Sequence, residues 1–164
     1  MSLALILKFL HVAIAMWLVT GLIGRNVVLA RARRSTDIHE VITLLPVSAI
    51  FERSMVIPAG SAVLIAGLLT AWAEGWPILG FIQGGKSNWV LVSLLLSLAF
   101  IPLVIFVFTP RGRVFEKALN EAVKQQRVTP ELTVAFNDRA VRAAHTFEMA
   151  LIAVIVALMV LKPF

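Results

Sequence analysis

Apolar residues occur along this chain in four long blocks separated by shorter polar segments. The blocks run from Leu3 to about Gly24, from about Met55 to Trp72, from Trp89 to Phe108, and from about Ala144 to Leu161. A helix that crosses a bilayer needs about 20 mainly apolar residues, and each block approaches that length. The pattern therefore predicts an all-α fold, in which residues 1–164 form a single integral membrane domain built as a four-helix transmembrane bundle.

A different periodicity follows the third block. Between residues 114 and 123, apolar positions recur at helical spacing and charged residues occupy the opposite side. This predicts an amphipathic interfacial helix in the connection between spans three and four. Thr129 and Pro130 are typical of a helix start, and no breaker follows before Pro163. We therefore expect the fourth span to be the end of one long helix that begins near Pro130.

Basic residues are concentrated in two of the three connections. Twelve of the 15 lie between spans one and two or between spans three and four, whereas Lys86 alone lies between spans two and three. The positive-inside rule then places both basic loops in the cytoplasm and both termini on the extracytoplasmic side of a bacterial-type plasma membrane. The basic loops are expected to contact anionic headgroups of the lipid bilayer at the cytoplasmic face.

Composition narrows the class of protein further. Apolar residues make up 60% of the chain, charged residues 15%, and the mean hydropathy is +0.93. These values exclude a disordered chain and argue against a soluble enzyme, which would expose too much apolar surface. The absence of cysteine excludes a disulfide framework, an iron–sulfur cluster and a thiol nucleophile. No nucleotide-binding or hydrolase motif is present, so whether the chain is an enzyme stays open.

Two polar residues interrupt the first span. Lys8 and His11 are three positions apart and share one face of the helix. His11 lies about 12 Å in from Leu3, which is too deep for an interfacial side chain. It is a candidate axial ligand of a haem. The alternatives are a ligand of another metal, a proton-transfer group, or a histidine hydrogen-bonded to a neighbouring helix. Lys8 is, together with His11, a candidate cofactor-binding residue, and its side chain has two alternatives: it extends to the headgroups or pairs with Glu74.

A second polar cluster is expected at the cytoplasmic edge. Arg142, His145 and Glu148 recur every three residues. Glu148 lies about one turn inside the fourth span, where a carboxylate needs a cation, and Arg25 or Arg53 is its natural partner. Either this cluster is a set of ion pairs that fixes helix packing, or it is a polar pocket that holds an anionic headgroup or carries protons. Its expected members are Arg25, Glu52, Arg53, Arg142, His145 and Glu148.

Part of the sequence is similar to known families. The stretch from Leu7 to Leu22 resembles the first helix of an uncharacterised bacterial family of predicted four-helix integral membrane proteins that carries a domain-of-unknown-function label. The stretch from Phe51 to Gly60 resembles the same family. The Lys8-x-x-His11 opening is also similar to that of HemJ-type protoporphyrinogen oxidases and copper-resistance-D-like membrane proteins. The HemJ resemblance implies that His11 is associated with haem. Spans two to four contain no lysine to match a further HemJ lysine.

Three functions remain open at this point. The first is a haem-associated or redox membrane protein that uses His11 and, with it, haem b. The second is an accessory or structural subunit of a larger membrane complex, with other membrane proteins as partners and with docking surfaces on the basic loops. The third is a small-solute or ion carrier. The basic residues lie in short juxtamembrane loops, so no nucleic-acid partner is expected. His11 and His145 are about 15 Å apart in depth, too far to ligate one iron together.

Overall fold

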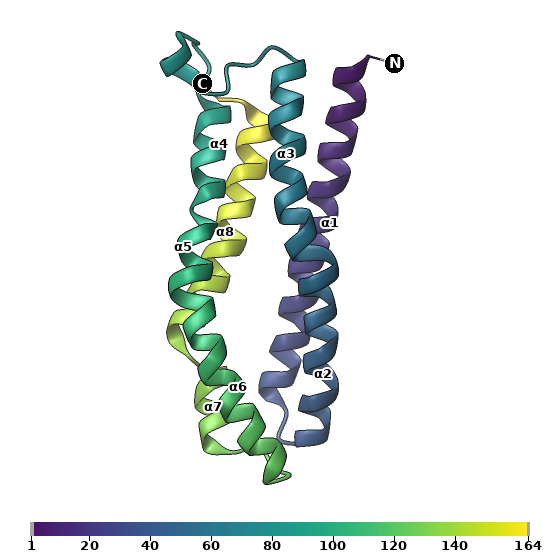
Figure 1. Ribbon diagram of the computed structural model, residues 1–164, viewed down its shortest axis with the longest axis vertical. Coiled ribbons are helices and arrows are strands. Elements are labelled where there is room, and N and C mark those ends of the chain that lie inside the picture. Colours follow the sequence, from purple (N-terminus) through teal and green to yellow (C-terminus); the bar gives the residue numbers. More distant parts are fainter. Residues whose placement is uncertain (1, 164) are drawn as a thin grey trace.

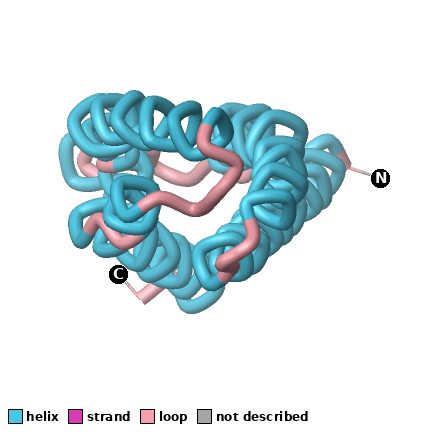
Figure 2. Tube along the Cα trace, turned by 90° about the horizontal axis from the view of Figure 1, so that it is seen from below, coloured by secondary structure: helices cyan, strands magenta, loops and turns pink. Residues whose placement is uncertain are grey.

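The computed structural model describes residues 2–163, nearly all of them helical (Figures 1 and 2). The N-terminal part consists of α1 (Leu3–Arg34), α2 (Ile38–Phe51), the π-helical segment η1 (Glu52–Val56) and α3 (Ile57–Ala73). A short 3-10 turn, η2 (Gly80–Gln83), follows. The remaining elements are α4 (Trp89–Leu98), α5 (Phe100–Leu103), the π-helical segment η3 (Val104–Phe108), α6 (Thr109–Lys124), α7 (Pro130–Phe136) and α8 (Arg139–Leu161).

Four helical segments, which we call rods and which are continuous or nearly continuous, are long and apolar enough to cross a membrane. They cover Leu3–Arg34, Ile38–Ala73, Trp89–Lys124 and Pro130–Leu161, and this confirms the four predicted spans. Each rod extends beyond its apolar block at one end, because the polar residues that follow the block continue as helix. Both termini lie at the end of the bundle that also carries η2 (Figure 1). Trp76 and Trp89 pack together here, so we call it the tryptophan end and its opposite the basic end.

The helices are organised as two halves. In the N-terminal half, α1 packs along α2, η1 and α3; in the C-terminal half, α4 and η3 pack on α8, and α6 packs on α7. Few backbone positions of one half approach the other (Figure 1, purple and blue against green and yellow). The two halves are therefore internally cohesive bodies joined at a limited number of places.

Apolar clusters join the halves at both ends. At the tryptophan end, Ala71 of α3 is buried with Trp89 and Val90 of α4, and Met159 packs against them. At the basic end, the buried core combines residues of α2, α6 and α7, namely Ile38, Val41, Ala122 and Leu132. The apolar side of α6 thus packs against other helices of the bundle. A location of α6 at the membrane surface stays a prediction.

The fourth rod is interrupted near its start. The expectation of one helix from Pro130 onward is wrong, because α7 ends at Phe136 and α8 begins at Arg139. The carboxylate of Asp138 accepts hydrogen bonds from the backbone N–H groups of Ala140 and Val141 at 2.8 and 3.1 Å. An aspartate that caps a helix in this way satisfies amides that have no intrahelical partner. The cap therefore starts a new helix without any glycine or proline at the break.

Spans two and three each contain one π-helical segment. In both cases the segment ends two residues before a proline, Pro58 after η1 and Pro110 after η3. A proline ring has no N–H and displaces the carbonyl of the preceding turn. A wider turn accommodates this defect, and it changes the direction of the side chains on that turn.

Candidate functional site

Arg25 is the buried centre of an ionic cluster. This arginine of α1 is only 6% exposed. One terminal nitrogen, Nη1, donates to Glu52 Oε2 at 2.6 Å, and the other, Nη2, donates to Glu148 Oε2 in a short ion pair. Nδ1 of His145 lies 3.2 Å from Arg25 Nη2 and 3.3 Å from Glu148 Oε2. We call these four residues, Arg25, Glu52, His145 and Glu148, the ionic cluster.

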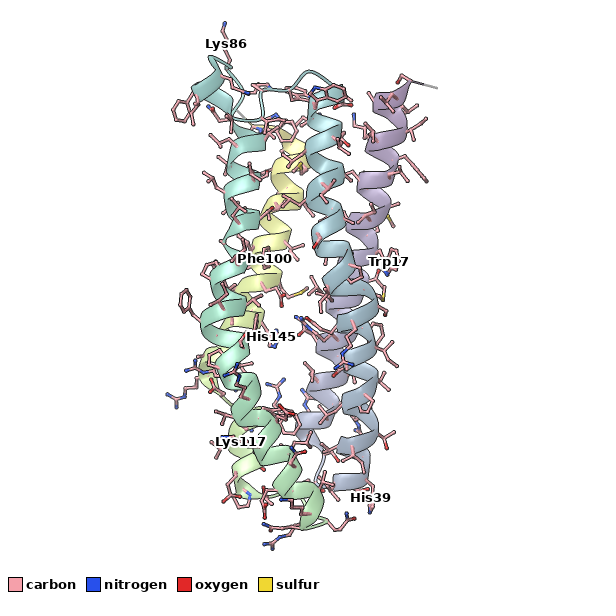
Figure 3. The ribbon with its side chains drawn as sticks, viewed as in Figure 1. Trp17, His39, Lys86, Phe100, Lys117 and His145 are labelled. Atoms are coloured by element: carbon pink, nitrogen blue, oxygen red, sulfur yellow. The ribbon has the colours of Figure 1, made fainter. Side chains whose placement is uncertain are left out.

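The ionic cluster connects the two halves. Arg25 and Glu52 belong to the N-terminal half, whereas His145 and Glu148 both lie on α8 of the C-terminal half. In Figure 3 the labelled His145 lies between the halves, and Trp17 lies at the periphery. The pair between Arg25 and Glu148 is therefore an electrostatic contact across the division, located between the apolar clusters of the two ends.

Both π-helical segments contact this cluster, one from each half. Glu52 is the first residue of η1. Phe108 is the last residue of η3, and its ring packs against the imidazole of His145 with centroids 4.8 Å apart. Single π turns within α-helices occur frequently at functional sites. Their presence on two separate spans at the same cluster identifies it as the candidate site of this protein.

Small residues allow the helices to approach closely at this level. A Cβ on Gly21 would lie 2.7 Å from Met55 Cβ, and a Cβ on Gly24 would overlap the ring of Phe51. These glycines bring α1 against the end of α2 and η1, so that the Arg25 side chain reaches Glu52. Gly21 and Gly24 therefore serve the close packing of α1 in this region.

Two expected members lie outside the cluster. Arg53 and Arg142 have exposed side chains, and within residues 2–163 neither forms a side-chain ion pair. Arg53 follows Glu52 by one position, which turns it about 100° away on a helix. Arg142 is six positions before Glu148, and this spacing places it about 120° from that carboxylate around the helix. Of the two predicted partners of Glu148, Arg25 and Arg53, the structure has Arg25.

The first polar pair, at the tryptophan end, is more open to solvent. Lys8 Nζ lies 2.6 Å from Glu74 Oε1, and Trp76 Nε1 donates to Glu74 Oε2 at 3.1 Å. Of the two alternatives for Lys8, the structure has the ion pair with Glu74. The hydrogen bond from Lys8 is the largest cause that holds the pKa of Glu74 below its ordinary value.

His11 lies one helical turn below Lys8 and contacts the next helix. Its Nδ1 donates to the carbonyl of Val63 at 3.0 Å, and its ring packs on Gly67, where a Cβ would lie 2.9 Å from Cε1. His11 is about 21 Å from Arg25 along α1, so it is not part of the ionic cluster. The described residues contain no group of three or more histidine and carboxylate side chains that could hold a metal ion.

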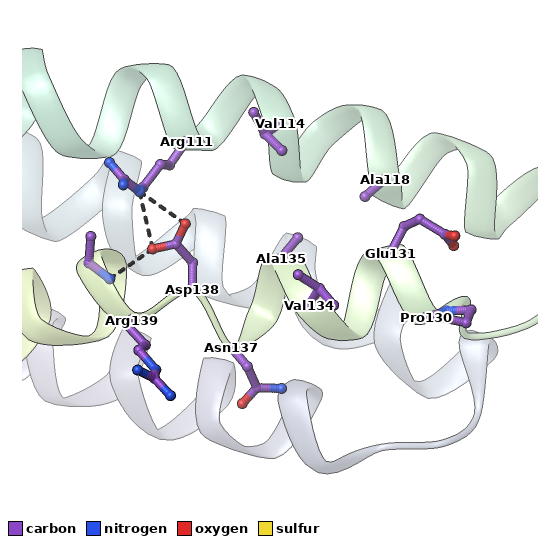
Figure 4. Close-up of a pocket in the computed structure, with 11 residues that line it drawn as sticks. Arg111, Val114, Ala118, Pro130, Glu131, Val134, Ala135, Asn137, Asp138 and Arg139 are labelled. Atoms are coloured by element: carbon purple, nitrogen blue, oxygen red, sulfur yellow. Dashed lines mark hydrogen bonds and ion pairs between the residues drawn. The ribbon is translucent and has the colours of Figure 1, made fainter.

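A shallow hollow at the basic end has a different character. It is lined by α6, α7 and the start of α8 (Figure 4). Nε of Arg111 donates to both carboxylate oxygens of Asp138, at 3.1 and 2.9 Å. Because this arginine and this carboxylate neutralise each other and much of the remaining lining is apolar, the hollow offers little chemistry of its own.

Sequence reasoning missed Phe108 and the division into halves. Phe108 is one of several aromatic residues in an uninterrupted apolar block, and nothing in the sequence distinguishes it from a lipid-facing neighbour. Pro110, two residues after it, is the one signal of an irregular turn.

Comparisons with known proteins give one match. A family model described as predicted integral membrane protein (DUF2269) matches residues 5–163. Among curated proteins nothing matches the chain. No solved structure matches it either. The more distant likeness to HemJ-type and copper-resistance-D-like proteins stays a prediction.

Proposed function

Since the chain belongs to the predicted integral membrane protein family DUF2269, we propose that it acts within the bilayer, as a carrier of small ions or solutes. One observation supports this proposal above the others. Arg25 and Glu148 of the ionic cluster are buried, and the pair that they form joins the two helical halves.

The free-energy cost of such a cluster supports a functional role. A charged side chain within a membrane helix costs about 2.5–3.5 kcal/mol on insertion scales. Well-packed apolar residues often give equal or greater stability than a buried ion pair. Leucine and alanine at the cluster positions would thus be sufficient for a stable contact between α1 and α8. Ionisable groups at such positions are typical of ion and proton pathways.

The arrangement of the halves supports a carrier cycle. Packing is extensive within each half and sparse between them, which favours rigid-body movement of one half against the other. Apolar clusters close the bundle at the tryptophan end and at the basic end. In the proposed cycle, these two clusters open in turn, and the ionic cluster between them changes partners as the transported species passes.

Reconstitution tests the proposal directly. The purified protein is placed in liposomes, and currents are recorded on a supported membrane with gradients of H⁺, Na⁺, K⁺ or Cl⁻. We expect a current above that of protein-free liposomes for at least one ion. We expect Glu148→Gln to reduce it at least tenfold. Glu74→Gln, which removes the carboxylate of the other ion pair, is the matched control and should retain the current. Folded wild-type protein that moves none of these ions would contradict the proposal.

Haem association at His11 is the second candidate, and one observation favours it. Metal-bound histidines usually donate their other ring N–H to a carbonyl or carboxylate, and His11 Nδ1 donates to Val63. This hydrogen bond fixes the tautomer that leaves the lone pair on Nε2, which forms no hydrogen bond with the described residues. His11 would then hold the iron of haem b, which would supply one-electron redox chemistry.

Visible absorption spectroscopy tests this second candidate. The protein is expressed under haem-replete conditions, purified in mild detergent and measured in oxidised and reduced forms. A stoichiometric Soret band that is lost in His11→Ala and kept in His39→Ala is the expected result. A colourless wild type with native helix content would exclude haem association. The hypothesis of an accessory subunit stays a prediction.

A further inference from the structure

One nitrogen of His145 has two partners that make opposite demands. Nδ1 lies 3.2 Å from Arg25 Nη2 and 3.3 Å from Glu148 Oε2. A guanidinium can only donate a hydrogen bond, and an ionised carboxylate can only accept one. Nδ1 therefore accepts from Arg25 when it carries a lone pair, or donates to Glu148 when it carries a proton. It cannot do both at the same time.

The two states differ in the formal charge of the cluster. Arg25 contributes one positive charge, whereas Glu52 and Glu148 contribute two negative charges. The groups that face His145 come from every element packed around it: Arg25 of α1, Glu52 of η1 through Arg25, Glu148 of α8, and the uncharged ring of Phe108 of η3. With a neutral imidazole, the cluster has one negative charge in excess; Arg25 and Glu148 are buried, and Glu52 is partly exposed. One proton on His145 removes the excess charge.

We propose that the ion coupled to this carrier is the proton and that Nδ1 of His145 binds it. The inference rests on the proposed carrier function and specifies its substrate. A hydronium ion transfers its proton to the lone pair of Nδ1 and becomes water, as one O–H bond breaks and one N–H bond forms, and the hydrogen bond from Arg25 to that nitrogen is lost. The new N–H of the imidazolium donates to Glu148 Oε2. No other bond forms or breaks, and the formal charge of the cluster changes from −1 to zero.

The position of these groups gives the proton a mechanical effect. His145 and Glu148 are three residues apart on α8, whereas Arg25 lies on the other half. When the imidazolium pairs with Glu148, the carboxylate is compensated within its own helix. The pair between Arg25 and Glu148 is then weaker, and Arg25 remains paired with Glu52 in its own half. Protonation thus replaces a contact between the halves by contacts within each half.

Nitrogen NMR tests this assignment without any transport assay. The protein is labelled with ¹⁵N-histidine, reconstituted in nanodiscs and titrated between about pH 5 and pH 9. The chain has three histidines, and the signals of His145 are those absent from His145→Gln. We expect His145 to gain its proton at Nδ1, and we expect Glu148→Gln to weaken proton binding at least tenfold. Glu52→Gln also removes one negative charge, from the more exposed side of the cluster. It replaces Glu148→Gln in this titration if Glu148→Gln does not fold. Glu74→Gln should leave the titration of His145 unchanged.

The separation of the halves provides the second readout. Because the chain has no cysteine, single cysteines at the exposed positions Ile50 and Phe106 can carry spin labels on opposite halves. We expect the distance distribution to shift between high and low pH in the wild type and to stay fixed in His145→Gln. Identical titration of His145 in wild type, Glu148→Gln and Glu52→Gln overturns the assignment. If His145 binds a proton but no ion current is measured, the proton site stands and the carrier function is rejected. If currents are measured but His145 binds no proton, the carrier function stands and the proton site is rejected.

Discussion

Two ion pairs join helices at different levels of the bundle, and they differ in their access to solvent. Lys8 and Glu74 at the tryptophan end have side chains that are 48% and 21% exposed, whereas Arg25 and Glu148 are each 8% exposed. The exposed pair connects α1 to the residue that follows α3 within one half. The buried pair connects α1 to α8 across both halves. The same type of interaction therefore stabilises a local contact in one place and the relation between two bodies in the other.

The largest effect is expected from removal of the buried cation. Arg25→Ala leaves Glu52 and Glu148 without their shared partner. Removal of one member of a buried ion pair costs about 3–5 kcal/mol because the remaining charge is uncompensated. The free energy of unfolding, measured by denaturant titration in detergent, should fall by this amount. Arg53→Ala, which removes an exposed arginine at the adjacent level, is the control and should change it by less than about 0.5 kcal/mol.

A double substitution separates the charge from the contact. Arg25→Met combined with Glu148→Met keeps much of the side-chain volume and removes both buried charges, while Glu52, whose side chain is 38% exposed, keeps its charge in contact with solvent. We expect it to recover most of the stability lost in Arg25→Ala. If the double variant were as unstable as Arg25→Ala, the cluster would be required for packing, and the argument from uncompensated charge would fail.

A smaller effect is expected where η1 meets α1. Gly21→Ala places a Cβ 2.7 Å from Met55 Cβ, an atom attached to the backbone that cannot rotate away. Overpacking of this kind costs about 1–3 kcal/mol. Gly60→Ala is the matched control, because no atom lies within 4 Å of its added Cβ, and it should be neutral or stabilising. Equal stability of the two variants in the same titration would show that α1 and η1 do not pack as closely as described.

The smallest effect is expected for the exposed ion pair. Exposed pairs contribute about 0–1 kcal/mol, so Lys8→Gln should lower stability only slightly at neutral pH. The lowered pKa of Glu74 means that this contribution is present above the ordinary pKa of a glutamate and is lost as the pH falls through the lowered value. Melting temperatures of wild type and Lys8→Gln should therefore converge on acidification and in high salt. A difference that grows at low pH would contradict this interpretation of Lys8 and Glu74.

The spans and the two ion pairs could be predicted from the sequence. Blocks of about 20 apolar residues leave few alternatives to a membrane helix, and a carboxylate such as Glu148 one turn inside a span requires a cation from a neighbouring helix. Glu74 is one of the predicted partners of Lys8, and Arg25 is one of the predicted partners of Glu148. The structure contains both of these ion pairs.

The membership of the cluster could not be predicted fully. A spacing of three residues moves about 60° around a helix at each step, so Arg142 drifts off the face that His145 and Glu148 share. The direction of Glu52 depends on the π-helical turn of η1, which sequence periodicity does not report. The break before α8 depends on the side chain of Asp138, a cap inside a polar segment that also suits a continuous helix. Each miss arises from local geometry that tertiary packing decides.

The π-helical segments give the chain a requirement for length as well as for composition. Each such turn accommodates one residue more than an α-helical turn. Deletion of a single residue from Glu52–Val56 would let the helix close into regular form and would leave the flanking helices nearly in register, whereas the same deletion within α3 would rotate the side chains on one side of it by about 100° relative to the other. Glu52 lies on the wider turn itself, so its contact with Arg25 depends on the extra residue as well as on the residues of the ionic cluster. Engineering or comparison of such chains thus has to count residues between the prolines and the cluster, in addition to matching their identities.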